Sequence, residues 1–65
     1  MTVNELTMRT WYLQNIIIKK DDMECTWLFE GGNDALRSDL YKELLSQEVR
    51  SIGATNDTLI IMVNK

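Results

Sequence analysis

The sequence predicts an α+β fold of ββαββ order, with one helix packed on one face of an antiparallel four-stranded sheet. Three observations support this prediction. Residues typical of strands are concentrated in 10–30 and again in 48–64, and leucines recur at four-residue spacing between those two regions. β-branched and aromatic residues favour strands, whereas apolar residues three or four positions apart favour a helix that faces a core. With 65 residues the chain has room for one domain, residues 1–65.

Residues 10–20 and 23–30 predict a hairpin that turns at Asp21-Asp22. In its best register the pairs on one face are Lys20–Met23, Ile18–Cys25, Ile16–Trp27 and Gln14–Phe29. The other face then pairs Lys19 with Glu24, which are opposite charges. A slip of one residue would exchange the two faces, so this pattern favours one register.

The segment after the second strand predicts a helix over about residues 34–46. Gly31-Gly32 ends the strand, and Asn33 is a residue type that caps helix N-termini. The expected core stripe consists of Leu36, Leu40 and Leu44, widened by Tyr41 and Leu45. Such a stripe would pack the helix against one face of the sheet.

A second hairpin is predicted from strands at about 48–54 and 58–64, joined by a turn at Asn56-Asp57. Pairing Thr55 with Thr58 places Ala54 opposite Leu59 and Ile52 opposite Ile61, and it turns Ile60 and Met62 to the other face. Residues 1–8 leave three alternatives open, since they can extend the first strand, form a short turn, or fold back over the second sheet face.

Composition excludes several classes of function. The formal net charge of −3 opposes general binding to DNA or RNA, which depends on a basic surface. The longest apolar runs are far shorter than the ~20 residues of a membrane-spanning helix. The first nine residues lack the pattern of a secretory leader, and one cysteine permits no internal disulfide. The expected location is therefore the cytoplasm.

The reactive side chains predict no catalytic, cofactor-binding or metal site. Cys25 is expected to point inward as a small apolar group, and the chain has no histidine to act as its base. The carboxylates around Asp21-Asp22 match no calcium loop. Gly31-Gly32 precedes the predicted helix without the longer glycine pattern of phosphate-binding loops. We therefore expect a protein that is not an enzyme.

The feature with the most functional content is the sheet face that a single helix leaves uncovered. The residues expected on it are Trp11, Leu13, Ile17, Leu28, Ile60 and Met62. An apolar face of this kind is typical of a partner surface. The preferred hypothesis is a small interaction module that self-associates through its sheet as a homodimer, with a further protein partner left open. The alternative is a binder of small ligands or single-stranded nucleic acid that uses Trp11 and Tyr12.

Overall fold

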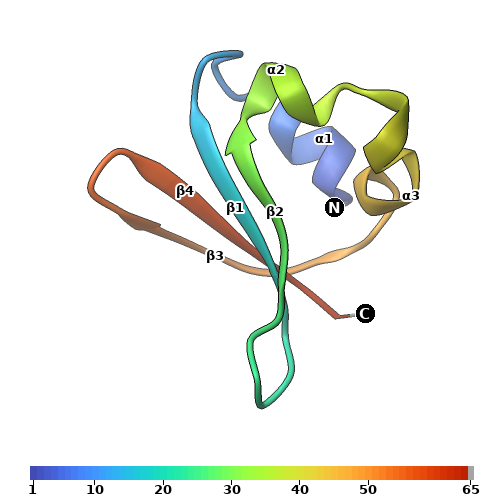
Figure 1. The fold of residues 1–65 in the computed structure, drawn as a ribbon, viewed down its shortest axis with the longest axis vertical. Helices are drawn as coiled ribbons and strands as arrows, with labels where there is room; N and C mark the ends of the chain where they lie inside the picture. Colours follow the sequence, from blue (N-terminus) through green and yellow to red (C-terminus); the bar gives the residue numbers. More distant parts are fainter. Residues whose placement is uncertain (65) are drawn as a thin grey trace.

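Residues 1–64 are described by the computed structural model, in which four strands form one sheet and the helices gather on one side of it (Figure 1). In chain order the elements are α1 (Val3–Met8), β1 (Asn15–Lys20), β2 (Trp27–Gly32), α2 (Asn33–Leu36), the 3-10 helix η1 (Asp39–Tyr41), α3 (Lys42–Leu45), β3 (Val49–Thr55) and β4 (Thr58–Val63). The α+β class and the four-stranded sheet predicted from the sequence are confirmed. An unpredicted helix, α1, precedes the first strand.

The sheet is mixed, which corrects the expectation of a purely antiparallel one. Its strand order is β2-β1-β4-β3, and the central strands β1 and β4 run parallel. The two hairpins on either side are antiparallel. β1 and β4 carry the longest apolar runs of the chain, Ile16–Ile18 and Leu59–Val63, so the two central positions shelter the strands that lose most by exposure.

The second hairpin has the predicted register. Thr55 pairs with Thr58, Ala54 with Leu59 and Ile52 with Ile61. Asn56 adopts the left-handed backbone conformation, with φ of 52°, that tight two-residue turns require. The pairing shifts near the start of β3, between Val49 and Ser51.

The pairing of the first hairpin is displaced by four residues from its predicted register. Ile18 stands opposite Phe29, whereas the sequence had placed it opposite Cys25. The chain between the strands forms a longer loop, in which the Asp22 carboxylate accepts a hydrogen bond from the Thr26 amide at 3.3 Å. The even displacement keeps Ile18 and Phe29 on the core face. A bulge beyond Ile18 then places Trp27 opposite Lys19.

The predicted helix over 34–46 is broken into α2, η1 and α3. Ser38 lies at the break, and its hydroxyl accepts a hydrogen bond from the Leu40 amide at 3.3 Å. A serine side chain that binds nearby backbone competes with continued helix. As a consequence Leu36 is fully buried, whereas Leu40 is 85% exposed, so its assignment to the core was wrong.

Residues 1–8 pack α1 on the same sheet face as the other helices. Val3 is fully buried in the core cluster, whose other members are Ile16, Ile18, Phe29, Leu36, Ile61 and Val63. Neither a strand extension nor a cover for the second face is formed. The unpredicted helix begins at a recognisable signal, because Thr2 and Glu5 form a reciprocal capping box.

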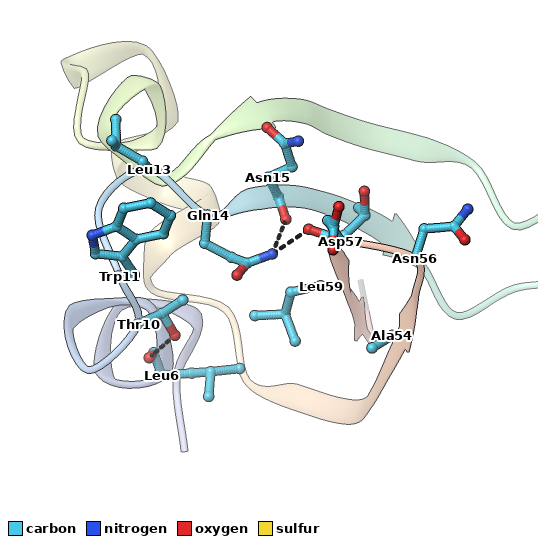
Figure 2. Close-up of a pocket in the computed structure, with 11 residues that line it drawn as sticks. Leu6, Thr10, Trp11, Leu13, Gln14, Asn15, Ala54, Asn56, Asp57 and Leu59 are labelled. Atoms are coloured by element: carbon cyan, nitrogen blue, oxygen red, sulfur yellow. Dashed lines mark hydrogen bonds between the residues drawn. The ribbon is translucent and has the colours of Figure 1, made fainter.

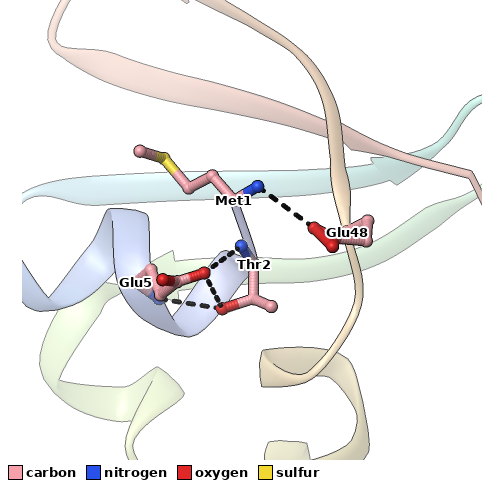
Figure 3. Close-up of polar contacts among 4 residues, drawn as sticks. All are labelled: Met1, Thr2, Glu5 and Glu48. Atoms are coloured by element: carbon pink, nitrogen blue, oxygen red, sulfur yellow. Dashed lines mark hydrogen bonds and ion pairs between the residues drawn. The ribbon is translucent and has the colours of Figure 1, made fainter.

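Figure 3 shows how the N-terminal residues are held. The Glu5 carboxylate accepts a hydrogen bond from the Thr2 amide at 2.8 Å, and the Thr2 hydroxyl accepts one from the Glu5 amide at 3.1 Å. The hydrogen bond from the Thr2 backbone is the main reason that the pKa of Glu5 lies below its ordinary value. The Met1 ammonium group also lies 3.2 Å from the Glu48 carboxylate. These contacts tie α1 to the chain that leads into β3.

Asn33 holds the end of the α1 segment against α2. Its side chain is 3% exposed, and Nδ2 donates to the carbonyl oxygens of Thr7 (2.8 Å), Thr10 (3.1 Å) and Trp11 (3.3 Å). The predicted capping role for this side chain was wrong, because Gly32 occupies the N-cap position of α2. A buried amide that satisfies carbonyls from a distant segment fixes the tertiary arrangement of both.

Candidate functional site

Apolar side chains line the centre of the sheet face that points away from the helices. Ile17 of β1 is paired with Ile60 of β4, and Met62 stands beside Lys19 in the next row. Cross-strand partners share a face, and Ile16 and Ile18 occupy the core face, so these residues lie on the opposite one. Ile17, Ile60 and Met62 are half-buried by their neighbours in the sheet. We call this surface, with the adjoining Trp27 and Leu28, the uncovered face.

The uncovered face has charged groups at its margin. Glu30 stands opposite Ile17, and Lys19 stands opposite Trp27. The Lys19 ammonium lies 5.0 Å from the centroid of the Trp27 ring, a distance at which a cation is attracted to the aromatic face. Both an anion and a cation therefore border the apolar centre.

The predicted interface residues are only partly brought together. Ile17, Ile60 and Met62 are on the uncovered face as expected, and Leu28 sits at its edge next to the bulge of the first hairpin. Trp11 and Leu13 were placed on a strand by their composition, but they belong to the loop between α1 and β1. Sequence reasoning also turned Trp27 toward the core, because a bulge leaves no mark in the alternation of residues.

A groove lies on the helix side of the sheet, between α1 and the turn end of the β3–β4 hairpin (Figure 2). This groove has a volume of about 620 Å³. Its lining includes Leu6, Trp11, Leu13, Ala54 and Leu59. Volumes of 300–1,000 Å³ with mostly apolar walls are usual for small-molecule sites.

The groove is also lined by polar residues, namely Thr10, Gln14, Asn15, Asn56, Asp57 and Thr58. The side-chain amide of Gln14 donates to the backbone oxygens of Asn15 and Asp57, and the Thr10 hydroxyl donates to that of Leu6 at 2.9 Å. Trp11 packs edge-on against Tyr12, with ring centroids 6.2 Å apart, and both rings are exposed. Of the two aromatics only Trp11 lines the groove, and neither lies on the sheet.

Within residues 1–64, no group of three or more cysteine, aspartate or glutamate side chains is placed so that it could hold a metal ion. Cys25 is exposed on the loop between β1 and β2, which overturns its predicted place in the core. The Asp21 carboxylate is paired with Arg50 at 3.2 Å, and that of Asp22 with Lys20 at 4.0 Å. No helix of the described chain is long and apolar enough to cross a membrane.

Comparisons with protein-family models, with curated proteins and with solved structures found no match. Function is therefore inferred from the uncovered face and the groove alone.

Proposed function

We propose that this chain is a small non-enzymatic interaction module that self-associates through the uncovered face as a homodimer. The observation that supports this is the row of Ile17, Ile60 and Met62 on a face without a covering helix. When one face of a sheet is left in water, it is normally polar. Domains of this size commonly need additional buried surface for stability. The proposal places the homodimer in the cytoplasm, because the single cysteine forms no internal disulfide.

The composition of the uncovered face suits contact with a second copy. Two-fold symmetry brings the same patch of both subunits together, so the Lys19 margin of one copy can meet the Glu30 margin of the other. Complete burial of a large apolar side chain contributes about 1.5–3 kcal/mol. Ile17, Ile60 and Met62 are already half-buried in each chain, so dimer formation would gain roughly half of that energy for each of them. The apolar centre supplies affinity, and the charged margins supply orientation.

The test is the mass of the assembly by sedimentation equilibrium at tens of micromolar. Ile17→Lys should halve the mass, since it places a charge at the centre of the uncovered face. Ile60→Glu repeats the test on β4, and Met23→Lys is the matched control on a fully exposed loop residue. Circular dichroism verifies that each variant is folded. A wild-type mass of 7.6 kDa, or a folded Ile17→Lys protein of unchanged mass, would refute the proposal.

The groove supports a second candidate, the binding of a small apolar ligand beside Trp11. The supporting observation is a groove of about 620 Å³ in which Leu6, Leu13 and Leu59 line the wall together with Trp11. Trp27→Phe leaves Trp11 as the one tryptophan, so its fluorescence reports on the groove. We expect a medium-chain fatty acid to shift the emission, and nucleotides and single-stranded DNA to leave it unchanged. No shift with any of these probes would count against a ligand site.

A further inference from the structure

β3 is an unusually open outer strand. The strand order leaves β2 and β3 at the two edges of the sheet. All residues of 50–55 are exposed, and a Cβ added at Gly53 would meet no atom within 4 Å. No charged residue or proline occurs in 51–56. Proteins usually guard a sheet edge with charges, prolines or a covering segment, because its free backbone groups can pair with another strand. In β2 the charged Glu30 lies within the paired stretch, whereas the charge and the register shift of β3 lie at its first residues, around Arg50, and leave 51–55 open.

The hairpin register identifies the backbone groups that are free on this edge. Thr55 and Thr58 flank a two-residue turn, so they form the hydrogen-bonded pair next to it. Hydrogen-bonded and non-hydrogen-bonded pairs alternate along antiparallel strands. Gly53 is therefore bonded to β4, whereas the amide and carbonyl groups of Ile52 and Ala54 point outward. Two residues with free donors and acceptors thus flank a glycine.

We propose that β3 pairs antiparallel with β3 of a second copy, about a two-fold axis at Gly53. This register places Ile52 opposite the second copy's Ala54, and Ala54 opposite the second copy's Ile52. Both pairs then consist of residues with outward backbone groups, so each exchanges two hydrogen bonds. The two Gly53 residues meet at the axis, where the absence of side chains permits close approach.

Side chains agree with this register. Ile52 is 51% exposed and projects toward the helix side of the sheet, as does Ala54, which lines the groove. The second copy's Ile52 therefore covers Ala54 at the margin of the groove. In this register Arg50 lies near the second copy's Asn56-Asp57 turn, and its guanidinium is also paired with Asp21 of its own chain at 3.2 Å. The second copy's Asp57 carboxylate would add a further partner to this ion pair at both ends of the contact.

The edge contact is separate from the face contact of the proposed function. A two-fold axis between antiparallel strands stands perpendicular to the sheet, so the helices of both copies lie on one side. The two uncovered faces join into one continuous face on the other side. Ile17, Ile60 and Met62 take no part in the edge contact. Two edge-paired copies can stack their continuous face on that of two others, so both contacts together assemble four chains as two homodimers. Removal of either contact then halves the mass, and the two associations can be tested independently.

Cysteine cross-linking tests the predicted axis. Opposed residues of a non-hydrogen-bonded pair have Cα atoms about 4.5 Å apart, which a disulfide can bridge. In a Cys25→Ser background, Gly53→Cys should form a disulfide-linked dimer under a glutathione redox buffer. Leu40→Cys in the same background is the matched control, because Leu40 is highly exposed and belongs to η1 and not to the β3 edge. Equal cross-linking of both variants would overturn the proposal.

A proline substitution gives a second readout. Ala54→Pro removes an outward amide and leaves the β3–β4 hydrogen bonds in place, a position at which edge strands tolerate proline. It should halve the mass in sedimentation equilibrium without changing the circular dichroism spectrum. Ile17→Lys should leave the yield of Gly53→Cys cross-linking unchanged. An unchanged mass for folded Ala54→Pro contradicts the edge contact, whereas the face contact is judged by Ile17→Lys alone.

Discussion

Replacement of Asn33 by aspartate should separate the predicted role of this residue from the one that the structure shows. Aspartate preserves the shape of the side chain and is an equally good helix cap. It removes the Nδ2 donor that reaches the carbonyls of Thr7, Thr10 and Trp11. A capping role therefore predicts no loss of stability, whereas the tertiary role predicts a large one.

The expected loss follows from the hydrogen bonds. Two amide hydrogens serve three carbonyls, and the Thr7 and Trp11 oxygens also accept backbone bonds, from Thr10 at 3.1 Å and Gln14 at 3.0 Å. Two lost bonds at about 0.5–1.5 kcal/mol each, plus about 1–3 kcal/mol for leaving the Thr10 carbonyl without a partner, amount to roughly 2–6 kcal/mol. A chain of this length has a free energy of unfolding of about 3–10 kcal/mol, so much of it would disappear.

Urea unfolding followed by circular dichroism measures this loss, with Asn33→Ala as the companion variant. Burial among carbonyl oxygens should raise the pKa of the introduced carboxyl group above its unfolded value of about 3.9. The folded state of the aspartate variant is then least penalised below pH 3.9, and the penalty grows as the pH rises toward the folded pKa. A loss below about 0.5 kcal/mol at neutral pH would refute the tertiary role.

Three further results are expected. Leu36→Ala should lower the free energy of unfolding by about 2–5 kcal/mol and Leu40→Ala by less than about 0.5, since only Leu36 is buried; equal losses in urea unfolding would contradict the broken helix. A thiol reagent should modify Cys25 at similar rates in native and denatured protein, and strong protection would show that the loop is closed. Because the pKa of Glu5 is lower in the folded state, its carboxylate should stabilise the fold at pH values above the ordinary carboxyl pKa, and this contribution should disappear as the pH falls through the folded pKa. Glu5→Gln should therefore reduce the loss of stability at acidic pH in a stability–pH curve.

The second hairpin could be predicted to the residue because its alternation and its turn agree. Asn56 suits the left-handed turn, and the apolar residues of β4 leave one register that keeps Ile61 inside. The predicted turn of the first hairpin, Asp21-Asp22, contains neither glycine nor asparagine, the residues that favour the left-handed backbone of tight hairpin turns. Its strands consequently pair four residues away from the predicted register, although the same β1 residues reach the core.

The candidate site was predictable where it depended on alternation alone. Ile17, Ile60 and Met62 could be assigned to one face from their spacing, since period two holds whatever the neighbouring strand is. Trp11 and Leu13 could not, because β-forming composition does not reveal that the strand begins later, at Asn15. The groove could not be predicted from the sequence for a related reason. Its walls come from α1, a loop and the second hairpin, which are brought together only by folding.

The sequence by itself determined the α+β class, the second hairpin and the inward residues of the central strands. These depend on local periods of hydrophobicity and on turn residues. Only the tertiary structure decided the parallel pairing of β1 with β4, the break at Ser38 and the burial of Asn33. Each of these depends on partners distant in the chain, where burial and hydrogen bonding outweigh the weak local preferences that a sequence displays.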